Sequence, residues 1–445
     1  MSKFEIKDEK SYLAKVPNLL IISNMCLSQS SSNGRTLRNF LIGWPMKNIA
    51  QFYIKPGTPD FSVCEKYLCI TDSQAAKAFL GKKTVAQRPN KSDSVPADSS
   101  KKQMKRNAVT MLAREVAWNS RRWMTSEFDD FVESFSPDIL LLQAGDCGFM
   151  CSLAKDLAQK YDIPLVVYNS ESYYFNNFNY FLEKEFTYFS FKLFRHNFRR
   201  RFEQMMRVAA KTVYICDSLQ KAYDDVFHAP SETIYTATEM TPGMEHAGDD
   251  RFTVTYLGNL GLGRHKSLME IAETLHTISE DIYLDVYGSA KAAVQQELEQ
   301  CPAVRYHGVV SYDEVQRIMR QSSLLVHAES FENAYRKSLQ FAFSTKIPDS
   351  LASGTCFLLY APEEMACTKY LKEHEAAYVV SDKENLKPTL ELLVQNSDAR
   401  EKYISTALQL AAENHNAEKN ANRFQAILKQ AVIDKNEGST GKLRI

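Results

Sequence analysis

The chain has no excess of either charge and no long apolar run. Among its 445 residues, Lys plus Arg number 54 and Asp plus Glu number 54, so no overall field would draw the chain to nucleic acid. The N-terminal lysines precede a short apolar stretch at 19–22, whereas a signal peptide needs about 7–15 apolar residues and a membrane span about 20. An anionic partner would therefore have to be bound locally.

Glycine and proline are also scarce, and the nine cysteines are scattered through apolar stretches. Cys147 and Cys151 lie close together in the sequence, but no second pair completes a zinc-binding pattern. The sequence therefore predicts reduced, buried thiols in a cytoplasmic protein and no metal site. Its length and a hydrophobic share of 44% indicate a globular chain of two or three domains.

Short apolar runs alternate with helical stretches along the chain, which is the pattern of parallel α/β sheets. Strands are expected in the first half at 19–23, 51–54, 67–70, 139–143, 165–168 and 212–216, and in the second half at 252–257, 282–287, 304–307, 324–327, 356–360 and 377–380. These runs are almost entirely apolar, as burial on both faces of a sheet requires. The sequence therefore predicts two doubly wound, Rossmann-like domains, at 1–240 and 250–420.

Three segments depart from this pattern. Residues 82–106 are rich in Lys, Ser, Asp and Pro, and we expect a mobile insertion there. Residues 241–250 have the composition of a linker between domains. The stretch 399–432 is expected to be helical, and 421–445 to hold the end of that helix and a frayed tail.

A glycine-rich loop follows the strand expected at 252–257. It reads Gly-Asn-Leu-Gly-Leu-Gly-Arg-His-Lys over 258–266, and apolar residues then recur at helical spacing. A strand, a glycine turn and a helix direct backbone N–H groups and a helix dipole at one point, and glycines let the main chain approach an anion. The glycine spacing fits neither a Walker loop nor a dinucleotide fingerprint. We predict a diphosphate-binding loop; the alternative is a tight turn with solvated basic residues.

Four further stretches follow the loop, at 284–288, 304–315, 323–331 and 344–354. In order and spacing they resemble the C-terminal domain of retaining group-1, family-four-like glycosyltransferases of the GT-B fold, which include bacterial surface-polysaccharide enzymes. The resemblance covers 250–420, and the first half only in layout. It implies two α/β domains facing across a cleft and a hexosyltransferase-type enzyme. Such an enzyme would transfer a sugar, with retention, from a nucleotide-sugar to a glycan or lipid-linked glycan in surface polysaccharide or glycoconjugate synthesis.

The resemblance also implies roles for individual residues. Arg264 and Lys266 would hold the donor phosphates and offset charge on the departing nucleotide. Glu329 matches the first member of the family's paired-glutamate motif, which contacts the transferred sugar, and completes the catalytic candidates. Asp349 matches the second member, which binds ribose, although the spacing is longer than in the family and Asp replaces Glu; the role of Glu332 stays open. Further donor-binding candidates are Gly258, Asn259, Gly261, Gly263, Ser344, Thr345 and Lys346.

Some of these residues have ordinary structural alternatives. Ser344 and Thr345 would equally well cap the helix that follows them. Lys346 would equally well be solvated. His327 is expected to be a packed residue at a strand end rather than a sugar contact.

In the first domain, Gly34 ends a Ser-Ser-Ser-Asn-Gly sequence after the first strand. The resemblance places it in a second glycine loop near the diphosphate and the acceptor; an ordinary turn is the alternative. Asp146 and Glu171 follow strand ends, where doubly wound sheets place their ligands, and are acceptor-side candidates or ordinary loop residues.

The stretch 141–146 lacks the histidine that related enzymes carry there, so no catalytic histidine is transferred. We identify no nucleophile for a double displacement either. Both points favour front-face transfer in which the leaving phosphate helps to deprotonate the acceptor. Cations and a helix dipole would then take the part that metal ions play elsewhere, with no cofactor besides the nucleotide-sugar substrate.

A basic aromatic segment spans 191–207. Its four phenylalanines at 191, 194, 198 and 202 recur at helical spacing among six positive residues and one negative residue. Such a helix suits an anionic membrane surface or a lipid-linked acceptor, which would place the protein at the cytoplasmic membrane face. The alternative is an inter-domain helix that packs its phenylalanine stripe and leaves the arginines solvated, and no matching basic surface points to nucleic acid.

Two rival functions remain. The first is a sugar-nucleotide epimerase or hydrolase, which would use the same fold without a glycan acceptor. The second is a non-catalytic GT-B subunit that binds a partner enzyme, and the altered spacing between Glu329 and Asp349 is its best support.

Overall fold

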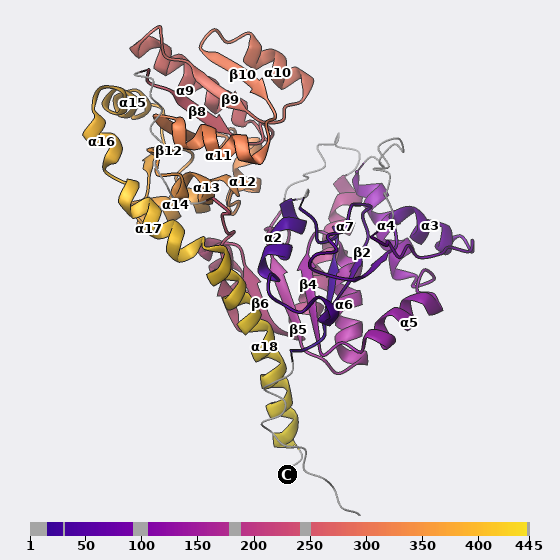
Figure 1. The fold of residues 1–445 in the computed structure, drawn as a ribbon. Helices are drawn as coiled ribbons and strands as arrows, with labels where there is room; N and C mark the ends of the chain where they lie inside the picture. Colours follow the sequence, from indigo (N-terminus) through magenta and orange to yellow (C-terminus); the bar gives the residue numbers. More distant parts are fainter. Residues whose placement is uncertain (1–15, 30–31, 92–105, 178–187, 241–250, 443–445) are drawn as a thin grey trace, which may run out of the picture. The chain divides into compact units, whose positions relative to one another are not determined.

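The computed structural model describes residues 16–29, 32–91, 106–177, 188–240 and 251–442 (Figure 1). The chain divides into two compact units. The first comprises 1–215, 220–234 and 421–445, and the second comprises 216–219 and 235–420. Each unit is built around one parallel sheet, which confirms the α/β class and the two Rossmann-like sheets expected from the sequence.

The first unit has seven strands in the order β3-β2-β1-β4-β5-β6-β7. They are β1 Leu19–Ser23, β2 Ile49–Tyr53, β3 Lys66–Cys69, β4 Ile139–Ala144, β5 Leu165–Asn169, β6 Ala209–Tyr214 and β7 Ser231–Thr233. Every residue of β1, β2 and β5 is buried, and each buried Leu or Val contributes about 1.5–3 kcal/mol. The edge strand β7 was not predicted, because its three polar residues have no apolar pattern.

Helices cover both faces of this sheet. They are α2 Ser32–Phe40, α3 Asp72–Phe79, α4 Ala108–Asn119, α5 Ser126–Phe135, α6 Gly148–Lys160, α7 Tyr188–Met206 and α8 Asp217–Asp224, with a 3-10 turn at Met46–Asn48. On one face the Phe40 ring packs edge-on against Tyr168 of β5, with centroids 5.5 Å apart. On the other, Trp118 of α4 stacks on Phe149 of α6 at 4.7 Å. The two buried faces explain why the strands are apolar throughout.

The C-terminal helix differs from the prediction. Instead of one helix over 399–432, the chain forms α16 Ser397–Glu401, α17 Ile404–Asn414 and α18 Ala417–Lys442. Phe424, Ile427 and Leu428 of α18 lie in the core of the first unit, since they recur on one face of the helix. The expected frayed tail is therefore helical as far as Lys442, and 443–445 lie outside the described residues.

The segment expected to be a mobile insertion at 82–106 is anchored at its start. The backbones of Gln87 and Cys69 of β3 exchange hydrogen bonds of 2.8 and 2.9 Å, and the N–H of Ala86 donates to Glu127. These contacts hold Ala86 and Gln87 against α5 and β3, and the mobility of the insertion stays a prediction. Residues 92–105 and the predicted linker at 241–250 lie outside the described residues.

The second unit has six strands in the order β10-β9-β8-β11-β12-β13. They are β8 Val254–Leu257, β9 Leu284–Tyr287, β10 Val304–Gly308, β11 Leu324–Ala328, β12 Phe357–Tyr360 and β13 Tyr378–Val380, each within two residues of its predicted position. The order reverses between β8 and β11. At such a switch point the loops after the two strands diverge and leave a place for a ligand.

The helices of the second unit follow the strands in alternation. Before α16 and α17 they are α9 Arg264–Ile278, α10 Ala292–Glu299, α11 Tyr312–Gln321, α12 Asn333–Leu339, α13 Lys346–Ala352, α14 Ala366–Glu373 and α15 Leu386–Gln395. The α9 residues Leu268, Ile271 and Leu275 lie in the core of this unit, as their helical spacing predicted.

The phenylalanine stripe of α7 lies inside the first unit. Phe191, Phe194, Phe198 and Phe202 are all buried, and the guanidinium of Arg195 donates to the carbonyl of Tyr174 at 2.9 Å. The prediction that this stripe faces a membrane is therefore wrong, because α4 and α6 already cover it. Among the described residues, no helix has the length and apolarity needed to cross a bilayer.

Candidate functional site

The glycine-rich loop joins β8 to α9 at the switch point of the second sheet. Leu262 and Gly263 both adopt left-handed backbone conformations, with φ of 59° and 78°. A Cβ atom on Gly263 would lie 2.6 Å from Ser330 Oγ and 2.8 Å from Glu332 Oε2, so only glycine fits between the loop and the segment after β11. A leucine held at positive φ is strained, and such strain clusters at ligand-binding sites.

Hydrogen bonds hold this loop in shape. Asn259 Oδ1 accepts from the N–H of Gly261 at 2.7 Å, and the hydroxyl of Tyr256 donates to the carbonyl of Asn259 at 2.9 Å. The N–H of Gly258 donates to the carbonyl of Tyr287 at the end of β9, and the N–H of Leu260 donates to that of Ser289 just after it. The loop therefore offers an anion fewer free N–H groups than its sequence suggested. Binding of an anion would depend more on the cations Arg264 and Lys266.

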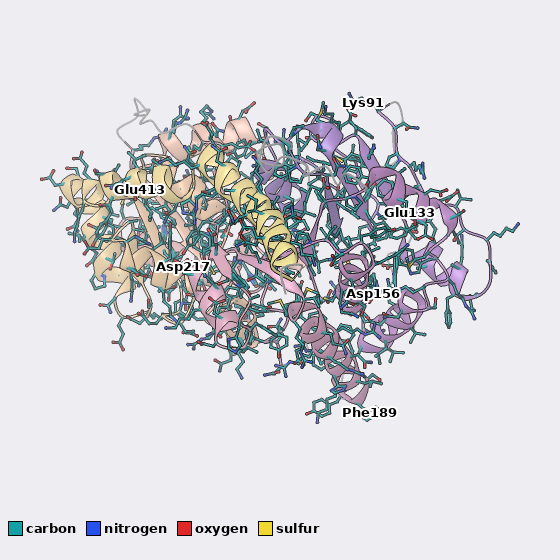
Figure 2. The ribbon with its side chains drawn as sticks, turned by 90° about the horizontal axis from the view of Figure 1, so that it is seen from below. Lys91, Glu133, Asp156, Phe189, Asp217 and Glu413 are labelled. Carbon is teal, nitrogen blue, oxygen red and sulfur yellow. The ribbon has the colours of Figure 1, made fainter. Side chains whose placement is uncertain are left out.

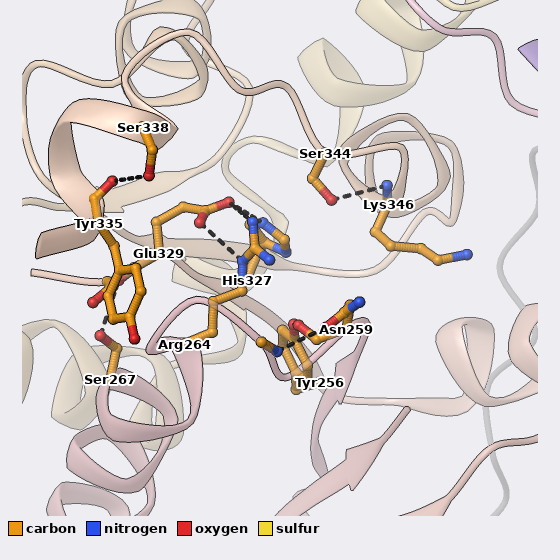
Figure 3. Close-up of polar contacts among 12 residues, drawn as sticks. Tyr256, Asn259, Arg264, Ser267, His327, Glu329, Tyr335, Ser338, Ser344 and Lys346 are labelled. Atoms are coloured by element: carbon orange, nitrogen blue, oxygen red, sulfur yellow. Dashed lines mark hydrogen bonds and ion pairs between the residues drawn. The ribbon is translucent and has the colours of Figure 1, made fainter. Parts of the chain in front are cut away.

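Arg264, the first residue of α9, pairs with Glu329, which follows β11 (Figure 3). The Nε and Nη2 groups of Arg264 each donate to one carboxylate oxygen of Glu329, both at 2.9 Å. Burial disfavours the charged form of Glu329, but Arg264 and His327 outweigh it and hold the pKa of this carboxyl below its usual value. Burial alone would lower the pKa of Arg264, but the neighbouring carboxylate of Glu329 outweighs burial and raises this pKa. The pair is ionised and geometrically fixed.

Lys266, two residues further along the same helix, has a different setting. Its side chain is 58% exposed, and Nζ donates to Glu332 Oε1 at 2.7 Å. An exposed ion pair of this kind exchanges easily for another partner. Lys266 is therefore available to an incoming anion, whereas Arg264 stays bound to its carboxylate.

The residues at and before α13 to which the resemblance gives donor-binding roles contact other protein groups. Asp349 is 4% exposed; its Oδ1 accepts from Thr238 Oγ1 at 2.7 Å, and its Oδ2 lies 3.5 Å from Lys346 Nζ. Ser344 Oγ accepts from the N–H of Lys346, as a capping residue does, whereas the Thr345 side chain makes no such cap bond. Lys346 is thus not simply solvated. Ribose and phosphate contacts by this helix stay predictions.

His327 is the packed strand-end residue that its sequence position predicted. It is buried in β11, its Nε2 lies 3.2 Å from Glu329 Oε1, and its ring stacks on Tyr256. Ser267 of α9 donates to the carbonyl of Glu329 at 2.9 Å. Neither Tyr256 nor Ser267 was predicted to support the site, because no local pattern distinguishes them from ordinary strand and helix residues.

The acceptor-side candidates Asp146 and Glu171 lie after β4 and β5, which are neighbouring strands. Asp146 is buried and ion-paired with Arg106. Glu171 is exposed to solvent. The first unit thus places these two carboxyl groups after the ends of neighbouring strands, as predicted; Arg106, at the end of the polar segment, carried no sequence signal.

Gly34 does not lie in a loop. It falls in the first turn of α2, which starts at Ser32, and its φ is not positive. The prediction of a second glycine loop around Gly34 is therefore wrong, and residues 30–31 lie outside the described part of the chain. Three or more His, Cys, Asp or Glu side chains grouped for metal binding are not found among the described residues.

Comparisons with known proteins found similarity to one protein family and to several solved structures. Residues 264–426 match the model of a family described as glycosyl transferase-like. A comparison with curated protein sequences gave no significant match. The similar region begins at Arg264 and includes Glu329, Lys346 and Asp349.

Solved structures of similar fold cover nearly the whole chain. HepE of Anabaena, solved with UDP, has a TM-score of 0.60 and 10% identity, covering 93% of this chain and all of HepE. Sucrose-phosphate synthase of Thermosynechococcus elongatus also has a TM-score of 0.60, with 11% identity over 93% of this chain and 98% of the synthase. The lipopolysaccharide outer core galactosyltransferase WaaB has a TM-score of 0.53 and 11% identity, covering 91% of this chain and 98% of WaaB. The chain has the GT-B fold of these solved glycosyltransferases, and its residues 264–426 are similar to the family described as glycosyl transferase-like.

Proposed function

We propose that the protein is a retaining glycosyltransferase of the hexosyltransferase type that uses a nucleotide-sugar donor. The observation that carries the proposal is the pair of cations, Arg264 and Lys266, in the first turn of α9 at the switch point between β8 and β11. One guanidinium and one ammonium group beside a helix N-terminus suit a diphosphate. The glycosyl transferase-like match over 264–426 supports the same chemistry.

The proposed reaction is a front-face transfer. The bond between the sugar's anomeric carbon and the diphosphate oxygen breaks, and the acceptor hydroxyl oxygen bonds to that carbon from the same side. The acceptor's proton passes to the departing diphosphate. Arg264, Lys266 and the N-terminal dipole of α9 stabilise the negative charge that grows on the diphosphate, so the chain's own groups supply the electrostatic part of catalysis without a further cofactor.

Uridine is the first nucleotide to test, since HepE was solved with UDP and with UDP-glucose. Thermal unfolding of the full chain is measured with UDP, GDP and ADP, because a ligand that binds only the native state raises the melting temperature. We expect one of the three to do so in the wild type. Absence of stabilisation by all three would contradict the proposal.

The loop's part in this binding is tested with Lys266→Ala. We expect the variant to fold normally, because its ion pair is exposed, and to bind the diphosphate roughly tenfold more weakly. Lys387→Ala is the matched control, since Lys387 also makes an exposed pair with a glutamate, on α15. Equal affinities for the two variants would show that the diphosphate does not use Lys266.

Turnover separates the proposal from its rivals. The full chain is incubated with UDP-glucose alone and the sugar is followed by NMR. Rapid release or epimerisation of the sugar without an acceptor would favour a hydrolase or epimerase. With a glycan acceptor, a product that keeps the donor's anomeric configuration supports retention, and inversion contradicts it.

The proposed acceptor is a glycan or lipid-linked glycan, with peripheral contact at the cytoplasmic membrane face. The outer end of α7 supports this contact, because Tyr188, Phe189 and Leu193 are exposed beside Lys192 (Figure 2 labels Phe189). Exposed aromatic and basic side chains together favour an anionic bilayer surface. Flotation with vesicles containing phosphatidylserine tests this contact. We expect the wild type to float with the vesicles, and the double variant Phe189→Ser, Lys192→Ser to remain in the unbound fraction. A wild type that does not co-float would contradict membrane contact.

A further inference from the structure

The carboxylate of Glu329 is bound on both oxygens inside the protein. One oxygen accepts from Arg264 Nε, and the other accepts from Arg264 Nη2 and lies 3.2 Å from His327 Nε2. The residue is 1% exposed. Both oxygens thus already accept hydrogen bonds from a charged donor, and a sugar hydroxyl would have to enter a place that solvent does not reach.

The backbone of Glu329 is equally fixed. Its N–H donates to the carbonyl of Tyr360 on β12 at 3.0 Å, and its carbonyl accepts from Ser267 Oγ of α9 at 2.9 Å. The backbone that carries the carboxylate therefore cannot shift toward a ligand without breaking contacts to β12 and to α9. Figure 3 shows the carboxylate of Glu329 turned to Arg264 and His327.

The ion pair with Glu329 fixes the orientation of the Arg264 guanidinium. A guanidinium has five N–H donors in one plane, and two parallel hydrogen bonds to a carboxylate fix that plane. Three donors remain on the side away from Glu329. Since Arg264 is the first residue of α9 and follows Gly263 directly, these donors belong to the same turn as the glycine loop.

We propose that Glu329 is a positioning residue that fixes the guanidinium of Arg264 for the donor diphosphate, and that it makes no contact with the transferred sugar. This inference rests on the proposed function, since it assigns Glu329 a part in the same donor site. It departs from the role implied by the resemblance, in which this carboxylate contacts the sugar. A positioning carboxylate acts on diphosphate affinity whether or not a sugar is attached.

The test is calorimetric titration of the full chain with UDP and with UDP-glucose. In Glu329→Gln the side-chain amide keeps one acceptor and turns an NH2 group toward Arg264 or His327, so the two parallel bonds are lost. We expect both ligands to bind roughly tenfold more weakly, by the same factor. If UDP affinity is unchanged and only UDP-glucose binds more weakly, Glu329 contacts the sugar and the inference is overturned.

A double-mutant cycle with Arg264→Ala separates positioning from a general loss of structure. We expect Glu329→Gln to weaken UDP binding in the wild type and to have no further effect in the Arg264→Ala background, because the two residues act as one unit. Additive effects would contradict the inference. Glu297→Gln is the control, since the exposed Glu297 of α10 pairs with another residue of α9, the buried His265.

Arg264→Lys provides a second route if Glu329→Gln does not fold. Lysine keeps the charge but cannot form two parallel bonds to Glu329. We expect a loss of UDP affinity of about tenfold despite the conserved charge; unchanged affinity would show that orientation is unimportant. A wild-type chain that binds none of UDP, GDP and ADP defeats the proposed function, whereas these variant results defeat only the role of Glu329.

Discussion

The carbonyl oxygen of Gly258 occupies the space that a side chain on Gly288 would need. A Cβ atom on Gly288 would lie 1.7 Å from that oxygen, and Gly288 has a φ of 148°. Gly258 opens the glycine-rich loop after β8, and Gly288 follows the neighbouring strand β9. The two glycines thus let the loop after β8 lie against the end of β9, which sets where the loop leaves the sheet.

Gly288→Ala should therefore displace the loop. We expect a loss of about 1–3 kcal/mol in the free energy of unfolding, as overpacking costs, together with weaker nucleoside diphosphate binding. Chemical denaturation and calorimetry measure the two effects. Gly308→Ala is the control, because Gly308 also has positive φ, at 75°, but its Cβ would meet nothing within 4 Å. Equal behaviour of the two variants would mean that backbone strain, rather than the contact with Gly258, sets the cost.

Asp349 provides a second prediction. Because its carboxylate is buried and accepts from Thr238, Asp349→Ala should cost about 1–3 kcal/mol of stability, since donors are left without an acceptor. Thr238→Val should also destabilise the chain, because it removes the other side of that bond. Urea denaturation measures both. A variant of normal stability with a large loss of nucleotide affinity would instead establish the ribose contact implied by the resemblance.

Much of the fold could be predicted because its signals are local. Apolar runs mark every strand except β7, whose three residues, Ser231–Thr233, lie at a sheet edge with no hydrophobic period. Gly34 was misplaced for the opposite reason: Ser, Asn and Gly favour loops, yet here they form the first turn of α2. Neighbouring structure overrides propensity in such short segments.

The sequence predicted which residues make up the candidate site in the second unit, but not which of their side chains form ion pairs. The order of the glycine loop and the β11 segment placed Arg264, Lys266 and Glu329 near one another. No local pattern shows that Glu329 pairs with Arg264, 65 residues away, while Lys266 pairs with Glu332. The packing of two loops at the switch point decides which side chains form these pairs. This packing depends on glycines that contact residues far away in the sequence.

The phenylalanine stripe of α7 gives a third prediction. Phe198 is buried, so Phe198→Ala should lower the free energy of unfolding by about 3–5 kcal/mol, through lost burial and the cavity left behind. Phe189 is 78% exposed, and Phe189→Ala should change stability by less than about 0.5 kcal/mol. Urea denaturation compares the two. A small effect at Phe198 would contradict the buried packing of α7 and reopen the stripe as a membrane-facing surface.

The last prediction concerns acid stability and His415. This ring is buried: Nδ1 lies 2.8 Å from the carbonyl of Thr236, which can only accept, so Nδ1 carries the proton and Nε2 accepts from the hydroxyl of Tyr370 at 2.9 Å. Burial lowers the pKa of His415 to about 4, with His374 adding to the effect. The folded state therefore prefers the neutral ring, whereas the unfolded chain protonates it near its ordinary pKa of about 6.5.

The sign of the pH effect follows from this difference. The contribution of His415 is fully present above about pH 6.5 and is lost as the pH falls toward 4, with a loss of roughly 2 kcal/mol between pH 7 and pH 5. His415→Gln keeps a donor and an acceptor but does not titrate. We therefore expect the stability advantage of the wild type over this variant, measured by urea denaturation, to shrink by about that amount at pH 5. His196→Gln, at an exposed position on α7, should show no such change. An advantage over His415→Gln that is the same at both pH values would mean that the buried ring does not couple folding to protonation.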